Sequence, residues 1–333
     1  MAVDFPRPVV HGGTGKRQRE NTGKNLLDFS ASLNPLPPRF AWQCDPACLS
    51  SYPDNEYARL KECIAKAFHR DPDEICVGNG SVELIRVFCS VALSGKMTYF
   101  TESPTFGEYA LSARLAGASA AGTPETASVS FVCNPNNPTG ELRSRSDLIA
   151  RVRDTSIYGG MLFVDEAFIE LADHPRESLV DVRGAQLFLL RSLTKSFAVP
   201  GIRFGYGFGD PDLIAKIETA RPPWSVNAYA EAFALEAFRH LDELGKAREY
   251  IRKERDRFSL KIDDLGLRCH PSSVNYLLVD CTQTVGPLCD QLETHGVLVR
   301  DCTSFGLPTC IRVAVRTHAE NDLLVEALSA CVR

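Results

Sequence analysis

The chain has 333 residues, of which 44% are hydrophobic and 24% charged, enough to bury a large core and to form one large domain with a smaller one. The formal net charge is −5 and the two signs are interspersed, which argues against a nucleic-acid-binding protein. No apolar run reaches membrane-spanning length, and the N-terminus lacks the hydrophobic core of a signal peptide. We therefore expect a folded cytoplasmic protein with no membrane partner.

The twelve cysteines are predicted to be reduced. Cys76, Cys89, Cys133 and Cys281 stand singly within apolar runs, where a thiol behaves as a small hydrophobic side chain. A pair separated by three residues occupies positions 44 and 48, but no second Cys or His pair follows at zinc-finger spacing. No metal site is expected.

Residues 1–24 are rich in Arg, Lys, Gly and Pro and are predicted to form an arm or mobile loop. The arm contains His11, Gly12 and Gly13, and glycines allow a backbone to approach a ligand closely. An extended segment over residues 28–35 should follow, ending in a proline-rich turn. Apolar spacing predicts an amphipathic helix over residues 56–68.

A strand beginning at Ile75 is expected to pass through Gly78 and Gly80 into a helix that ends near Leu93. The backbone amides at such a helix start form an anion site, although an ordinary glycine-rich turn explains the same residues. Strand-like and helix-like segments then alternate. The expected strands are 97–100, 129–133, 161–164 and 187–190, and the expected helices are 105–116 and 144–153.

This alternation predicts crossover units and a mainly parallel sheet in an α/β fold. Polar segments follow three of the strands: 134–140, Asp165 with Glu166, and 192–195. The edge of an open α/β sheet at which the strands end is where ligands bind. A long helical stretch over residues 226–263 should lead into a small α+β domain, with strands at 273–279, 297–299 and 310–315 and a helix at 320–332.

The apolar run 187–190 is followed by a polar turn that contains Lys195. An ε-amine is nucleophilic when deprotonated, and partial burial beside cations lowers its pKa. Arg203 is such a cation, and together with Ser192 and Ser196 it is suited to holding a phosphate. The segment therefore favours Schiff-base chemistry, while an ordinary surface lysine after a strand remains the alternative.

Five ordered motifs give the chain a resemblance to the fold-type I pyridoxal-phosphate (PLP) enzymes, close to histidinol-phosphate aminotransferases and threonine-phosphate decarboxylases. These motifs are Tyr-Pro-Asp at 52–54 with Tyr57, Gly-Asn-Gly-Ser at 78–81, Asn-Pro-Asn-Asn-Pro-Thr-Gly at 134–140, Asp-Glu-Ala-Phe at 165–168, and Ser-Leu-Thr-Lys-Ser-Phe at 192–197 with Gly-Ile-Arg at 201–203. The resemblance covers nearly the whole chain. It implies a large PLP-binding domain over 46–235, a small C-terminal domain over 236–333, and residues 1–45 as the arm and part of the small domain.

The resemblance also implies roles for individual residues. Lys195 would bond covalently to PLP, and Asp165 would keep the ring nitrogen protonated so that the ring accepts electrons. Asn137 would bind the phenolic oxygen, and Phe106 would stack on the ring, unless it is a core residue.

Further residues are implied to bind the cofactor phosphate or the substrate. The phosphate would be held by Gly80, Ser81, Val82, Ser192 and Arg203, with Tyr57 reaching it from the neighbouring subunit of a homodimer. Substrate binding is implied for His11, Gly12, Asn34, Arg300 and Arg312. The two arginines would hold the substrate's anionic groups, because a guanidinium binds carboxylate and phosphate oxygens in a fixed geometry.

Four features favour the decarboxylase over the aminotransferase. Residues 28–35 and the His11 to Gly13 segment resemble motifs of threonine-phosphate decarboxylases. Phe168 stands where the aminotransferases generally have a tyrosine, and Arg316 where they often have a glycine. The reaction implied is decarboxylation of L-threonine O-3-phosphate to an aminopropanol phosphate used for cobalamin. The alternative is an aminotransferase that acts on histidinol phosphate with 2-oxoglutarate.

Overall fold

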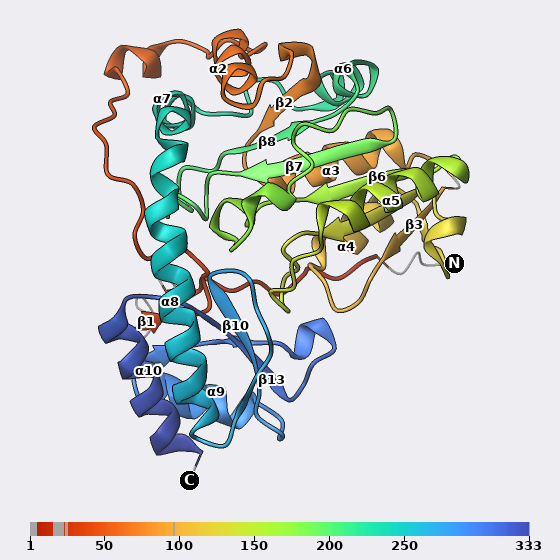
Figure 1. The fold of residues 1–333 in the computed structure, drawn as a ribbon. Coiled ribbons are helices and arrows are strands. Elements are labelled where there is room, and N and C mark those ends of the chain that lie inside the picture. Colours follow the sequence, from red (N-terminus) through yellow and green to blue (C-terminus); the bar gives the residue numbers. More distant parts are fainter. Residues whose placement is uncertain (1–4, 16–22, 24–25, 96, 333) are drawn as a thin grey trace.

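A seven-stranded sheet forms the centre of the larger part of the molecule (Figure 1). The computed structural model describes residues 5–15, 23, 26–95 and 97–332. The order across the sheet is β2 (Ile75–Gly78), β8 (Gly205–Phe208), β7 (Leu187–Ser192), β6 (Met161–Asp165), β5 (Val129–Cys133), β3 (Thr98–Thr101) and β4 (Ser119–Ala120). Strand β8 runs antiparallel to both of its neighbours, and the other pairs are parallel. The predicted mainly parallel sheet is confirmed.

Helices cover both faces of this sheet, so its central strands are apolar on both sides. One face packs against α3 (Ser81–Ala92), α4 (Glu108–Leu115) and α6 (Pro211–Ala220), and the other against α2 (Ala58–Phe68), α5 (Arg145–Ile157) and α7 (Ala228–Ala237). Successive strand residues alternate between the two cores, as in β6, where Phe163 joins the first core while Leu162 and Val164 join the second. This double burial explains the continuous apolar runs in the sequence.

A smaller α+β part lies below the large sheet (Figure 1). Its four strands are ordered β12 (Arg300–Asp301), β13 (Cys310–Ala314), β10 (Tyr276–Asp280) and β9 (Arg268–Cys269), and all three pairings are antiparallel. Strand β1 (Leu27–Asp28) pairs in parallel with β11 (Val297–Leu298). Helices α9 (Gly286–Thr294) and α10 (His318–Cys331) complete this part, and Phe29 packs in its core with Phe258 and Ile311.

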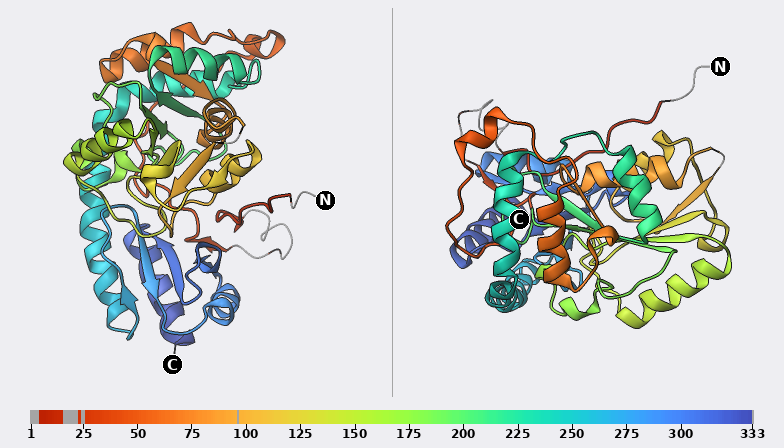
Figure 2. Two further views of the ribbon diagram at one scale, coloured as in Figure 1. Left: turned by 90° about the vertical axis from the view of Figure 1, so that its right-hand side faces the viewer. Right: turned by 90° about the horizontal axis from the view of Figure 1, so that it is seen from above.

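Helix α8 (Leu244–Asp263) is a single long helix that connects the two parts (Figure 1 and Figure 2). Its Arg255 forms an ion pair with Asp173, 2.7 Å away, at the lower side of the large part. The prediction of one helical stretch over 226–263 was wrong in detail. A 3₁₀ segment over Phe238–Glu243 separates α7 from α8, and His240 there has non-helical backbone angles.

The remaining strand and helix predictions agree with the structure to within a few residues, but the elements at 119–120, 205–208, 211–220, 268–269, 286–294 and 300–301 were missed. Short strands carry too few residues to show a periodicity. The predicted domain boundaries remain predictions, and residues 1–4, 16–22 and 24 of the predicted arm lie outside the described residues. None of the twelve cysteines forms a disulfide, and the four predicted core cysteines are buried. Among the described helices, none combines the length and apolarity that crossing a membrane requires.

Candidate active site

Lys195 lies in the turn that follows β7, at the edge where the parallel strands end. Its Nζ is 5.7 Å from the centre of the Phe168 ring. Burial, together with the positive charges of Arg312 and Arg203, lowers the pKa of the Lys195 amine to about 8. A far larger fraction of this amine is therefore deprotonated at neutral pH than of an exposed lysine, which suits a nucleophile.

Asp165, the last residue of β6, is buried beside the same edge. Its Oδ1 accepts a hydrogen bond from the Ala167 amide at 2.8 Å, and its Oδ2 accepts one from the Tyr109 hydroxyl at 2.7 Å. Burial raises the pKa of this carboxyl to about 6, although both hydrogen bonds oppose the shift. No Lys, Arg or His in the described part of the chain forms an ion pair with Asp165. The carboxylate is therefore suited to a cationic partner that the chain itself does not supply.

Tyr109 is a residue that the sequence analysis missed. It lies in α4, is fully buried, and packs edge-on against Phe106 with the ring centres 5.5 Å apart. The predicted helix over residues 105–116 places Tyr109 three residues after Phe106 and on the same face. This spacing was a signal that Tyr109 lies near the site. Phe106 itself is partly exposed, as its predicted stacking role requires.

The start of α3 forms a cradle suited to an anion. Gly80 precedes the helix with φ +83°, and no side chain caps the helix start. A Cβ on Gly80 would lie 2.3 Å from Nη2 of Arg203, so the guanidinium lies directly against this glycine. Ser81 and Val82 form the first turn, whose amides have no partner within the helix. Backbone donors and an arginine together fit a phosphate group.

Ser192 and Arg203 also contact their own backbone. The Ser192 hydroxyl donates to the Phe204 carbonyl at 3.2 Å, and Arg203 donates from Nη1 to the Pro200 carbonyl at 3.1 Å. Arg203 has φ +61°. These bonds hold both side chains at the end of β7, close to the cradle.

Arg312 and Arg300 are directly opposite each other on β13 and β12. Arg312 is buried and donates to Oδ1 of Asn137 and, at 2.9 Å, to the Ser30 carbonyl, while its Nε has no partner among the described residues. Arg300 donates to the Val10 carbonyl at 2.8 Å and to the Ser304 hydroxyl at 2.6 Å. Facing positions on neighbouring strands direct two guanidinium groups to the same face.

The arm reaches this region and contacts both parts of the molecule. His11 Nε2 is 2.9 Å from Oε1 of Glu108, a buried residue whose other oxygen accepts from Arg86 at 2.7 Å. A Cβ on Gly12 would lie 2.5 Å from the Ser30 carbonyl oxygen, and Gly13 donates to the Ser30 hydroxyl at 2.7 Å. The two glycines therefore allow a close contact that bulkier residues would prevent. Glu108 and Ser30 were not anticipated.

Two predicted site residues have other contacts. Tyr57 is fully buried, and its hydroxyl donates to the Val226 carbonyl and accepts from the Val226 amide at 3.1 and 3.0 Å. The hydroxyl is thus bonded to the backbone of its own chain, and its contact with the cofactor phosphate of a neighbouring subunit remains a prediction. Asn34 is also buried and donates to the Ser196 carbonyl at 2.7 Å. Asn34 thus anchors the turn that carries Lys195, and its contact with substrate remains a prediction.

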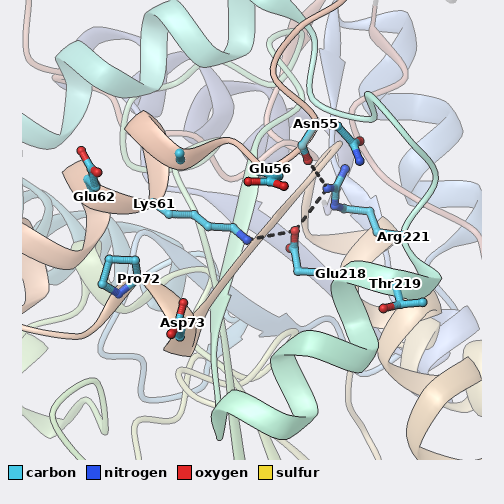
Figure 3. Close-up of a pocket in the computed structure, with 10 residues that line it drawn as sticks. Asn55, Glu56, Lys61, Glu62, Pro72, Asp73, Glu218, Thr219 and Arg221 are labelled. Carbon is cyan, nitrogen blue, oxygen red and sulfur yellow. Dashed lines mark hydrogen bonds and ion pairs between the residues drawn. The ribbon is translucent and has the colours of Figure 1, made fainter.

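A hollow of about 420 Å³ beside α2 and α6 contains none of the predicted site residues (Figure 3). Its lysine, Lys61, is 3.0 Å from Oε2 of Glu218, which also pairs with Arg221 at 3.2 Å. Lys61 is therefore part of an ion-pair cluster, and the hollow shares no lining residue with the site around Lys195.

The comparisons with known proteins agree with this geometry. The family described as Aminotransferase class I and II matches residues 45–328. The chain is 35% identical to a protein of Caldanaerobacter subterraneus subsp. tengcongensis that carries the provisional name threonine-phosphate decarboxylase, over 97% of this chain and 94% of that protein. It is 32% identical to the histidinol-phosphate aminotransferase of Symbiobacterium thermophilum, over 99% and 98% of the two chains.

Solved structures show the same fold. The histidinol-phosphate aminotransferase of Clostridium acetobutylicum has a TM-score of 0.80 at 27% identity, covering 92% of this chain and 99% of that one. The enzyme of the same name from Sinorhizobium meliloti, solved with pyridoxal 5'-phosphate, has a TM-score of 0.84 at 21% identity, covering 98% and 95%. The chain belongs to the class I and II aminotransferase family and has the fold-type I architecture of PLP-dependent enzymes. Its cofactor is PLP.

Proposed function

We propose that this protein is a decarboxylase that converts L-threonine O-3-phosphate to (R)-1-amino-2-propanol O-2-phosphate for cobalamin synthesis. The observation that carries the proposal is the facing pair Arg300 and Arg312 on neighbouring strands, because the charge of Arg312 also acts on Lys195. L-Threonine O-3-phosphate has two anionic groups, a carboxylate and a phosphate, and two facing guanidinium groups match them. The Caldanaerobacter relative and the arm residues that resemble the decarboxylases also support this choice.

In this proposal each predicted residue has a defined task toward the cofactor. PLP, when bound, supplies an electron sink next to the substrate Cα. The cofactor phosphate would be held by Gly80, Ser81, Val82, Ser192 and Arg203, and Phe106 would contact the ring. Asn137 would donate a hydrogen bond to the phenolic oxygen. Asp165 is buried and has no cationic partner in the described structure, and it would hold the proton on the ring nitrogen.

The substrate is held from the opposite side. Arg312 would bind the carboxylate and Arg300 the phosphate, and the two contacts together would fix the orientation of the Cα–carboxylate bond. When that bond breaks, CO2 leaves and its bonding electron pair stays on the substrate. Lys195, whose pKa is lowered to about 8, then donates a proton to Cα. The arm residues His11 and Gly12 close over the site and exclude water.

An aminotransferase acting on histidinol phosphate is the second candidate, favoured by the Symbiobacterium relative. Such an enzyme would orient the Cα–H bond across the ring, and Lys195 would remove that proton. It would also require 2-oxoglutarate as the acceptor of the amino group. The two functions therefore differ in a single requirement that an assay can measure.

The test follows CO2 release from L-threonine O-3-phosphate by the PLP-loaded protein, with no oxo acid present. Sustained release over many turnovers supports the decarboxylase. Absence of release, together with amino transfer from histidinol phosphate to 2-oxoglutarate, would overturn it. Arg300→Gln should raise KM for the phosphorylated substrate, with a smaller change in kcat, because the contact exists before and during the reaction.

We further propose that the enzyme is a homodimer. The support for this comes from the family resemblance alone, and the predicted role of Tyr57 toward the neighbouring subunit is part of the same proposal. Light scattering on the purified protein would measure the mass directly, and a monomer of 36.7 kDa would contradict the proposal.

A further inference from the structure

Three metal-binding side chains converge on the small four-stranded sheet. The ligand atoms of His270, Asp280 and Cys310 all lie within 4.8 Å of one another. Cys310 is buried, and the other two residues are half-buried. The three residues are distant in sequence: the first two positions are ten apart in number and the last two are thirty apart. This explains why the spacing of the sequence motifs did not reveal the cluster.

The sheet itself brings these residues together. Asp280 is the last residue of β10 and is directly opposite Cys310, the first residue of β13. His270 follows β9 immediately, and its amide donates to the Leu278 carbonyl of β10 at 2.9 Å. Each of the three side chains thus stands at, or next to, the end of one of three adjacent strands. Hydrogen bonds between the strands hold the backbone at these positions. Figure 1 shows β10 and β13 side by side in the smaller part.

The donor atoms are largely free to bind an ion. Within the described ranges, the His270 imidazole makes no hydrogen bond or ion pair. Asp280 accepts from the Thr282 amide through Oδ1 at 2.9 Å, which orients the carboxylate and leaves Oδ2 available. The Cys310 sulfur has a single long contact, 3.9 Å to the Thr309 hydroxyl. Outer contacts of this kind orient metal ligands without occupying their coordinating atoms.

We propose that His270, Asp280 and Cys310 bind a zinc ion. Imidazole, carboxylate and thiolate are the ligands that Zn²⁺ uses, at distances of about 2.0–2.3 Å. In a tetrahedral site such bonds place neighbouring ligand atoms about 3.5 Å apart, a spacing that small side-chain rotations would reach from the present one. The half-buried position leaves the fourth site to water.

The ion would link three strands of the small sheet. One of them, β13, also carries Arg312, two residues after Cys310 and therefore on the same face of the strand. A zinc ion at this position holds the end of β13 against β9 and β10. Its role is thus structural, and it does not depend on which reaction the enzyme performs.

The test uses Co²⁺ as a spectroscopic probe and Zn²⁺ as a competitor, with chelator-treated, PLP-loaded protein under reducing conditions. We expect one Co²⁺ per chain, with the visible bands of a tetrahedral thiolate complex, and displacement of Co²⁺ by Zn²⁺. Cys310→Ser and His270→Ala should each weaken binding at least about 100-fold. His270 is half-buried, so the second variant should fold even where the first does not.

A matched control addresses the other cysteine pair, Cys44 and Cys48, which lies near the surface. The double variant Cys44→Ser/Cys48→Ser should keep the Co²⁺ spectrum and the affinity of the wild type. Zn²⁺ should raise the melting temperature of the wild type but not that of His270→Ala. The proposal is overturned if no tetrahedral spectrum forms, or if the spectrum survives His270→Ala and is lost in the double variant.

Discussion

Two adjacent carboxylates, Asp165 and Glu166, are both buried at the end of β6 but have opposite surroundings. Glu166 lies 2.9 Å from Nη2 of Arg191 and accepts from the Ser178 hydroxyl and the Leu179 amide at 2.6 and 2.8 Å. Asp165 accepts from one hydroxyl and one amide and has no cation beside it in the described structure. Burial raises the pKa of both carboxyl groups, but Glu166 has a cationic partner and Asp165 has none in the described structure.

This difference separates a structural role from a chemical one. Breaking a buried ion pair leaves a charge without a partner, so a compensated carboxylate contributes to folding. An uncompensated carboxylate costs stability unless a ligand supplies the missing charge. Perturbed groups of this kind concentrate at functional sites. We therefore expect Glu166 to matter for the fold and Asp165 for the chemistry.

The largest expected effect is on stability, in Glu166→Gln. The change removes the negative charge that faces the buried Arg191 and should lower the free energy of unfolding by about 3–5 kcal/mol. Denaturant unfolding of the PLP-loaded protein would measure it. Activity per folded molecule should change little. A variant as stable as the wild type would show that Arg191 is satisfied by Glu170 alone, against our interpretation.

The converse is expected for Asp165→Asn. This variant should lose about 10²–10³-fold in kcat, because the ring nitrogen no longer has an anionic partner. Its cofactor-free form should be at least as stable as the wild type at neutral pH, because a costly buried charge is gone. Steady-state kinetics and unfolding of the cofactor-free protein would test both statements. A stability loss like that of Glu166→Gln would contradict the distinction between the two residues.

The pH dependence of stability provides a third test. The pKa of Asp165 is raised from 3.8 to about 6, so the folded state binds the proton more tightly than the unfolded state does. Its stabilising contribution is therefore complete below about pH 4 and is lost as the pH rises through about 6. Between about pH 4.5 and 7.5, the cofactor-free wild type should lose on the order of 2 kcal/mol relative to Asp165→Asn. Parallel pH profiles for the two proteins would contradict the raised pKa.

The sequence was sufficient to predict the order of the main elements and the turn that carries Lys195, since long apolar runs and glycine-rich turns are local signals. It did not reveal Tyr109 as the partner of Asp165, nor His270 as a neighbour of Cys310. Those contacts depend on how strands and helices pair over long separations. The sequence also did not reveal the contact of the Tyr57 hydroxyl with the Val226 backbone, because a motif identifies a residue type but does not show where its hydroxyl points.

The smallest expected effect comes from Phe168, which distinguishes this site from that of the tyrosine-bearing relatives. Its ring lies 5.7 Å from Nζ of Lys195 and packs edge-on against Tyr276, so a hydroxyl added at this position would enter the site. A donor to the cofactor's phenolic oxygen stabilises its deprotonated form. Phe168→Tyr should therefore lower, by about one unit, the pH midpoint at which the bound cofactor's visible absorption changes.

The appropriate control for this titration is Phe168→Leu, which removes the ring without adding a donor and should leave the midpoint near that of the wild type. A wild-type midpoint equal to or below that of Phe168→Tyr would contradict the prediction. The comparison is informative because neither substitution changes Asp165, whose carboxylate accepts hydrogen bonds from the Tyr109 hydroxyl and the Ala167 amide. A shift in Phe168→Tyr alone would thus show that the hydroxyl, and not the ring nitrogen's partner, sets the midpoint.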